Sequence, residues 1–246
     1  MIQPKNYFQA LMPVFNTKRT KEIFRVNPTV DPVREEAKEV KVDVYDYNAE
    51  DVKHLEFTGV QKCEKFKNNG KITWINIDGL RKIDVETICN SFNIHPLLIE
   101  DILSISQRPK MDELDNVLFA LLNMLYFNKD SAAVEQEQVS IILGKDYVLS
   151  FQEEACRDVF NPIREKINAA GSKIRTSGSD YLCYSLIDII VDNYYTVLEL
   201  LGEHIETLEE DIVKYGNTRS LSHINNLRKE LIILKRNINP VREVVN

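Results

Sequence analysis

The chain has 246 residues, a net charge of −7 and only four, widely spaced cysteines. The acidic balance argues against nucleic acid as a partner, and the absence of a C-x-x-C pair argues against a disulfide framework or a zinc site. The longest nearly apolar run, residues 117–127, falls short of the roughly 20 residues that a membrane helix needs. The first residues contain no long apolar core, so we also expect no signal peptide.

Residues 1–38 differ in composition from the rest of the chain. They contain a basic run at residues 18–21 and two prolines, Pro28 and Pro32, close together. Proline punctuation of this kind is typical of irregular chain. We predict an extended N-terminal arm.

Residues 39–175 carry short patterns of both strand and helix. Val40, Val42 and Val44 alternate with polar residues, which predicts a strand. Further strands are predicted at residues 60–66, 71–78, 116–128, 135–143 and 146–152, with a helical turn at 49–54. Helices are predicted at 85–92, where Asp84 is the expected N-cap, at 96–104, and at 158–170, closed by Gly171. This mixture predicts an α/β class fold, a mixed β-sheet in an α/β/α sandwich.

Residues 176–246 are predicted to form a long antiparallel helical hairpin that packs on the sheet domain and projects beyond it. Apolar residues recur at spacings of three and four in both arms. In the first arm they are Tyr184, Ile187, Val191, Tyr194, Leu198, Leu201, Ile205, Leu208 and Ile212; in the second they are Ile224, Leu227, Leu231, Leu234, Ile238, Val241 and Val245.

The two arms carry opposite charge. Residues 199–211 of the first contain six acids and no Lys or Arg, whereas the second arm is rich in Lys and Arg. One interpretation is pairing between the arms, with Glu206 near Lys229 and Glu199 near Arg236; each exposed pair then contributes only roughly 0–1 kcal/mol. The other is an acidic rod that concentrates cations through its field.

The stretch that most suggests a site is residues 93–103, a short apolar helix in which Glu100 and Asp101 are neighbours. Pro96 suits its first position, and His95 is expected to act at its entry rather than as a metal ligand. Adjacent residues project about 100° apart on a helix, so the two carboxylates are placed to meet different partners rather than to grip one ion together.

Asp188 is the second candidate, because it lies in an apolar part of the long helix that we expect to be buried against the sheet. A buried carboxylate needs a cation or hydrogen-bond donors. Two interpretations stay open for it: pairing with an Arg or a helix N-terminus, or a hard-cation site, since Mg²⁺ is often held by only one or two carboxylates and several waters.

No P-loop, G-x-G-x-x-G, G-x-S-x-G or H-E-x-x-H motif is present. A metal-dependent hydrolase built on Glu100, Asp101 and Asp188 is therefore only a remote alternative, and we expect that the chain is not an enzyme.

Taken together and in order, a series of motifs resembles the cytosolic part of CorA-type magnesium transporters. They are WINIDGL at 74–80, IHPL at 94–97, EDI at 100–102, RPK at 108–110, EQVS at 137–140, VLSFQE at 148–153, DYLCYSLID at 180–188 and PVREV at 240–244. The resemblance runs from about residue 40 to the end of the chain.

This resemblance implies that the chain is part of a homopentameric divalent-cation channel. It also implies that this part lies at the cytoplasmic face of the cell inner membrane. It implies that Mg²⁺, or another divalent cation, binds between neighbouring subunits and holds the pore shut. The positions that match the family's regulatory ligands are chiefly Asp101, with Glu100 and Asp188, and the facing ligand belongs to a stalk helix of the neighbour.

The stalk, two membrane helices and a Gly-Met-Asn loop of the family are not found in these 246 residues. We therefore expect the chain to be the cytosolic portion of a truncated transporter, attached to the membrane only through the missing helices. The alternative is a freestanding soluble interaction protein that kept the fold without transport.

Overall fold

The computed structural model describes residues 36–105, 107–154, 158–215 and 218–245. Apart from residues 1–35, the chain forms one compact unit, residues 36–246. The arm predicted for residues 1–38 thus lies, up to residue 35, outside the described residues.

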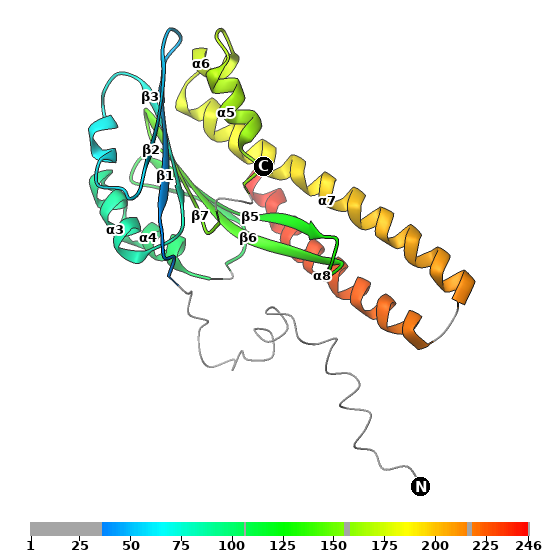
Figure 1. The fold of residues 1–246 in the computed structure, drawn as a ribbon. Helices are drawn as coiled ribbons and strands as arrows, with labels where there is room; N and C mark the ends of the chain where they lie inside the picture. The colour runs from blue at the N-terminus through cyan, green and yellow to red at the C-terminus, as the bar shows by residue number, and fades with distance from the viewer. Residues whose placement is uncertain (1–35, 106, 155–157, 216–217, 246) are drawn as a thin grey trace. The chain divides into compact units, whose positions relative to one another are not determined.

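A mixed seven-stranded sheet forms the centre of this unit (Figure 1). Its strands are β1 (Lys41–Tyr47), β2 (Val52–Phe57), β3 (Ile72–Asp78), β4 (Lys110–Leu114), β5 (Val117–Asn128), β6 (Ala133–Leu143) and β7 (Tyr147–Gln152). They lie in the order β2-β1-β3-β7-β6-β5-β4. β3 and β7 are parallel and the other neighbours are antiparallel, which confirms the predicted mixed sheet.

Helices cover both faces of the sheet. A 3₁₀ helix, η2 (Cys63–Phe66), and the helices α3 (Lys82–Ser91) and α4 (Pro96–Leu103) pack on one face. The helices α5 (Asn161–Asn168), α6 (Lys173–Thr176), α7 (Ser179–Tyr215) and α8 (Thr218–Val245) lie on the other (Figure 1). The predicted α/β/α sandwich with a long helical hairpin is confirmed.

β5 shows why its sequence is continuously apolar. Phe119 and Leu121 belong to the core beneath α3 and α4, whereas Leu122 and Met124 belong to the core beneath α7 and α8. Successive strand residues point to opposite faces, and here both faces are covered. An unbroken apolar strand of this kind is typical of a sheet buried on both sides.

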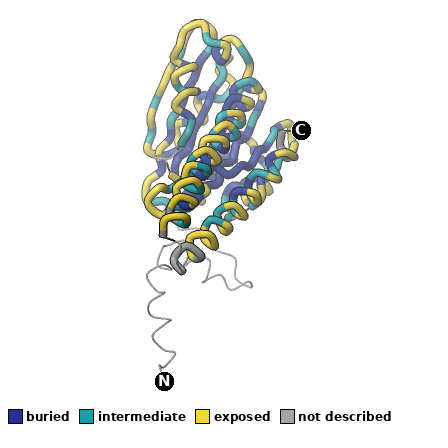
Figure 2. Tube along the Cα trace, turned by 90° about the vertical axis from the view of Figure 1, so that its right-hand side faces the viewer, coloured by how far each residue is buried: buried dark blue, intermediate teal, exposed yellow. Residues whose placement is uncertain are grey.

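The hairpin helices change character along their length. Near its start α7 buries Leu182, Leu186 and Ile190 against the sheet. Farther along, the helices extend past the ends of the strands (Figure 1), and exposed residues cover the outward side of their turns (Figure 2). The structure thus anchors one end of the hairpin and leaves the other projecting.

Two local predictions, one in the first hairpin of the sheet and one directly after it, were wrong. Residues 49–54 do not form a helical turn: β2 begins at Val52, after a turn in which the Asn48 side chain accepts hydrogen bonds from the backbone N–H groups of Glu50 and Asp51. Residues 60–66 are not a strand but end in η2, which buries Cys63 and Phe66. A pattern of so few residues did not distinguish a strand from a helical turn.

Asp84 is not the N-cap of α3. The helix begins two residues earlier, at Lys82, and Asp84 lies inside its first turn, where it is buried and accepts from Arg81 Nε. Similarly, α5 begins at Asn161 rather than at Asp158 and ends at Asn168, before Gly171. Asp158 instead accepts from the Phe160 N–H and pairs with Arg164.

The predicted seam between the two hairpin arms is only partly right. Leu201, Leu208 and Leu234 are buried, but Tyr184 and Leu198 are exposed. Both helices pack on the sheet as well as on each other, so each buried stripe is shared between the sheet and the neighbouring helix. Within the described part of the chain, neither Glu199 nor Glu206 forms an ion pair, so the predicted charge pairs with Arg236 and Lys229 are absent.

Candidate functional site: the carboxylates of α4

The helix α4 presents its carboxylates from a firmly anchored position. His95 is its N-cap, and its Nδ1 accepts a hydrogen bond from the Leu97 N–H at 3.2 Å. Leu98, Ile99 and Ile102 are buried beneath it. Because these apolar residues fix the inward face, the positions between them are held at the surface.

Asp101 is the less exposed of the two carboxylates, with 20% of its side chain exposed. Its Oδ1 accepts from Gln107 Nε2 at 2.9 Å, and its Oδ2 accepts from Lys110 Nζ at 2.6 Å. Lys110 also pairs with Asp112 at 3.2 Å. Burial lowers the pKa of Lys110, but its hydrogen bonds to the two aspartates outweigh this and hold the pKa above its usual value. Asp101 therefore already has a cation of its own chain beside it.

The backbone of α4 at this point is tied to the sheet. Gln138, from β6, donates through Nε2 to the carbonyl oxygens of Asp101 and Ile102, each at 3.3 Å. Its own Oε1 is buried and has no hydrogen-bond partner among the described residues. The Gln138 amide fixes the last turn of the helix and, with it, the base of the Asp101 side chain.

Glu100 lies in different surroundings from its neighbour. Its side chain is exposed, and in the described parts of the chain its carboxylate has no hydrogen-bond or ion-pair partner. The two adjacent acids thus differ in both exposure and partners, as expected for side chains about 100° apart on a helix.

The prediction that Asp188 is buried was wrong. Asp188 is exposed on the outer side of α7, where it accepts from the Tyr184 hydroxyl at 3.2 Å. Leu186 and Ile190, on either side of it, are fully buried toward the sheet. This stretch is apolar in composition, but one face of the helix is nevertheless exposed, and Asp188 lies on that face.

Within one chain, the structure does not bring Asp188 to the acids of α4. The helices α4 and α7 cover opposite faces of the sheet (Figure 1). Glu100, Asp101 and Asp188 thus share no cleft inside one subunit, which removes the geometric basis for a hydrolase built on all three.

Where the chain is described, a different group of side chains has metal-ligand spacing: Asp43, His54 and Glu56. The sequence interpretation missed it because residues 49–54 were assigned to a helical turn. The signal that was available is the His54-x-Glu56 spacing, which on a strand places both side chains on one face.

Among the helices that the structure describes, none is long and apolar enough to cross a membrane.

Comparison with known structures defines the class of this fold. The soluble domain of CorA from Methanocaldococcus jannaschii matches with a TM-score of 0.63 at 14% identity, covering 88% of this chain and 79% of that one. The ZntB cytoplasmic domain from Vibrio parahaemolyticus matches with a TM-score of 0.57 at 16% identity, covering 81% and 75%. The fold is that of these transporter domains.

The sequence comparisons identify the family. The family model described as CorA-like Mg2+ transporter protein matches residues 69–246. The cobalt/magnesium transport protein CorA of Thermotoga maritima is 38% identical over 207 residues, 84% of this chain and 59% of the relative. The chain therefore belongs to the CorA-like Mg²⁺ transporter family.

More distant relatives have the same general character. The putative metal ion transporter YfjQ of Bacillus subtilis is 26% identical over 172 residues, which cover 70% of this chain and 52% of the relative. The matches thus span little more than half the length of these two curated relatives.

Proposed function

We propose that this chain is the Mg²⁺-sensing part of a CorA-type divalent-cation transporter, placed at the cytoplasmic face of a membrane in a homopentamer. Membership of the CorA-like family supports a role in divalent-cation transport. The surface carboxylates of α4 supply the oxygen ligands that Mg²⁺ prefers. Mg²⁺ is here the regulatory ion as well as the cargo, and related divalent ions are alternatives.

The observation that carries the proposal is the placement of the acids on the outside of the sandwich. Asp101 and Asp188 project from helices on opposite faces of the sheet, so one subunit cannot close a site with both. Neighbouring subunits can, because a face of one subunit meets a different face of the next in a ring. The sensing site then consists chiefly of Asp101 from one subunit and ligands from its neighbour, with Glu100 and Asp188 contributing.

The proposed mechanism is linkage between ion binding and subunit arrangement. If Mg²⁺ binds Asp101 and a neighbour's ligands only in the closed arrangement, the ion favours closure by its difference in affinity for the two states. When the ion dissociates, Lys110 and Gln107 keep the Asp101 carboxylate hydrogen-bonded. Lys110 therefore competes with Mg²⁺ for the Asp101 carboxylate. This competition keeps the Mg²⁺ affinity low enough for the site to respond to changes in Mg²⁺ concentration.

A transport assay tests this function directly. Residues 36–246 replace the matching part of the Thermotoga maritima relative, and the chimaera is reconstituted in vesicles. We expect internal Mg²⁺ to suppress ion flux, and Asp101→Asn to leave the flux open at Mg²⁺ levels that close the unmutated chimaera. Glu113→Gln, at an exposed position on β4, is the matched control. Equal suppression in the Asp101→Asn and unmutated chimaeras would contradict the proposal.

A second candidate function is favoured by an apolar hollow on the hairpin. A cavity of about 350 Å³ lies between α7 and α8, lined by Tyr194, Tyr195, Leu198, Ile238 and Val241 among others. A freestanding interaction protein of the same fold would use such a surface to hold a partner. The gene beyond codon 246 distinguishes the two: apolar segments of membrane-spanning length favour transport, and an immediate stop codon favours the interaction protein.

A further inference from the structure

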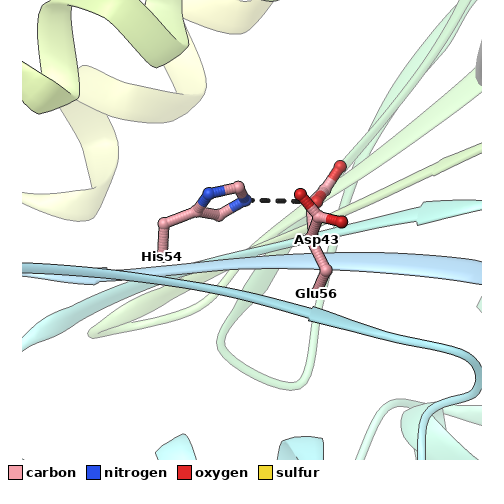
Figure 3. Close-up of side chains that lie close together, drawn as sticks. All are labelled: Asp43, His54 and Glu56. Carbon is pink, nitrogen blue, oxygen red and sulfur yellow. Dashed lines mark hydrogen bonds and ion pairs between the residues drawn. The ribbon is translucent and has the colours of Figure 1, made fainter.

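We propose that Asp43, His54 and Glu56 form a second cation site, one that binds a divalent transition metal such as Zn²⁺ and is separate from the carboxylates of α4. The three side chains rise from the same face of the β1–β2 pair (Figure 3). Their ligand atoms all lie within 4.8 Å of one another. The face is the one covered by α5–α8, whereas α4 lies on the opposite face.

The strand register builds this group. Asp43 is paired directly with Glu56 across the two antiparallel strands, and Tyr45 is paired with His54. Residues two apart on a strand share a face, so both pairs project to the same side. Paired strands hold side chains more firmly than a loop does, which is the kind of support that a binding site needs.

His54 is oriented before any ion arrives. Its ring stacks on Tyr45 with a centroid distance of 4.2 Å and an interplanar angle of 11°. Tyr45 is buried and in turn stacks on Trp74 at 5.4 Å. On its outer side, His54 Nε2 lies 3.2 Å from Asp43 Oδ1 (Figure 3). The imidazole nitrogen is thus directed at the carboxylates by a ring that is anchored in the core.

The charge balance of the group favours a bound cation. Like charges directly opposite each other on neighbouring strands are destabilising, and Asp43 and Glu56 form such a pair. The Arg164 guanidinium acts on Asp43 only at a distance, because it donates to Asp158 through both of its terminal nitrogens. Among the described residues, no Lys or Arg forms an ion pair with either acid. A metal ion between the strands relieves the repulsion.

The donor set determines the class of ion. One imidazole nitrogen and two carboxylate oxygens suit Zn²⁺ and its neighbours, whereas Mg²⁺ prefers oxygen ligands alone. In a tetrahedral zinc site adjacent ligand atoms lie about 3.4 Å apart, close to the 3.2 Å between His54 Nε2 and Asp43 Oδ1, and the exposed Glu56 side chain is free to adjust. The side chains of His54 and Asp43 are 34% and 24% exposed, which leaves room for water as the remaining ligand.

The test is a titration of the 246-residue chain with Co²⁺, whose visible absorption reports ligand type and geometry. Excess Mg²⁺ is present throughout to occupy the carboxylates of α4. We expect one Co²⁺ site, displaced by Zn²⁺, whose affinity falls at least tenfold in His54→Gln. Glu56→Gln alters an exposed side chain, so it serves as a second variant if His54→Gln fails to fold, and it should also weaken binding severalfold.

His223→Gln, which alters an exposed histidine on α8, and Asp101→Asn are the matched controls. Both should keep the Co²⁺ site unchanged. Co²⁺ affinity within twofold of the unmutated chain in both His54→Gln and Glu56→Gln would overturn the proposal. Because Asp101→Asn is scored separately, failure of this site and failure of the proposed sensing function give different results.

Discussion

At the level of single residues, Lys110 is as important as Asp101 for the proposed Mg²⁺ site. The ammonium group lies 2.6 Å from the same carboxylate oxygen that a Mg²⁺ ion would seek. A bound divalent ion and this ammonium repel each other, so ion binding must weaken or displace the lysine contact. We therefore expect Lys110 to lower the Mg²⁺ affinity proposed for Asp101 instead of raising it.

Replacement of the competing charge tests this relation. Lys110→Met keeps most of the apolar stem and removes the ammonium group, so we expect Mg²⁺ affinity to rise roughly three- to tenfold. The free energy of unfolding should fall by no more than about 1 kcal/mol, because the ion pair is partly exposed. Calorimetric titration measures the first effect and urea denaturation the second. Lys82→Met on α3 is the control, and weaker binding in Lys110→Met than in Lys82→Met would refute competition.

Glu137 predicts a pH dependence of stability. The residue is buried in β6, and burial raises its pKa to about 7, although it accepts hydrogen bonds from the backbone N–H groups of Glu153 and Glu154. The native chain therefore keeps a proton that the unfolded chain releases near its ordinary pKa of 4.5. Stability falls as pH rises through this window, by up to about 3 kcal/mol from this residue.

Glu137→Gln removes the titrating group while keeping an oxygen for the same two donors. We expect the free energy of unfolding, measured by urea denaturation at pH 5 and pH 8, to differ less between the two conditions than in the unmutated chain. Glu113→Gln, at an exposed position on β4, should leave the difference intact. An unchanged pH dependence in Glu137→Gln would show that its proton does not govern this window.

At the scale of elements, the docking of α8 depends on a buried polar contact. Asn237 accepts from Asn123 Nδ2 on β5 at 2.8 Å, and its Nδ2 lies 2.7 Å from Gln136 Oε1 on β6. Asn237 is 4% exposed. A helix that must place one amide between two strands has a single acceptable rotation and register on the sheet.

We therefore expect Asn237→Leu to lower the free energy of unfolding by about 2–4 kcal/mol, because it leaves Asn123 and Gln136 without that partner. In this variant, hydrogen exchange of the α8 backbone amides should speed up relative to the unmutated chain, and by more than exchange of the α3 amides. Asn226→Leu, at an exposed position of the same helix, is the control and should change stability by less than about 0.5 kcal/mol. Equal stability of the two variants would mean that apolar packing alone docks the helix.

The sequence identified most elements because their patterns are long. The continuous apolar run became β5, the Gly144 turn separated β6 from β7, and the long heptad-like repeat became α7 and α8. Short patterns failed: six residues of β2 alternate no more clearly than those leading into η2. Asp84 was predicted to cap a helix and Asp158 to begin one, yet each forms an ion pair with an arginine a few residues away, Arg81 and Arg164.

The surroundings of the candidate acids could be predicted only in part. Adjacent carboxylates in an apolar helix marked Glu100 and Asp101 as candidates, and the structure places both at the surface of α4. Periodicity could not show that Lys110 and Gln107 occupy the Asp101 oxygens, since that contact depends on how the chain turns between α4 and β4. The exposure of Asp188 was missed because it requires knowing which side of α7 faces the sheet.

At the scale of the whole molecule, the sandwich separates its charged features. The acids of α4 lie on one face, and Asp188 and the Asp43–His54–Glu56 group lie on the other. A regulatory ion that used Asp101 and Asp188 together would thus have to lie between molecules. This outward placement, in a chain of the CorA-like family, supports the proposal that Asp101 is the principal Mg²⁺ ligand of this chain.

The most direct measurement is calorimetric titration of Mg²⁺ into the 246-residue chain and its Asp101→Asn variant. One subunit supplies only part of the site, so we expect weak binding, with a Kd on the order of 1 mM. Asp101→Asn should weaken it at least about fivefold, since a carboxylate ligand becomes a neutral amide, while Glu113→Gln, at an exposed position on β4, should not. Equal Mg²⁺ affinity in the unmutated chain and Asp101→Asn would contradict the account.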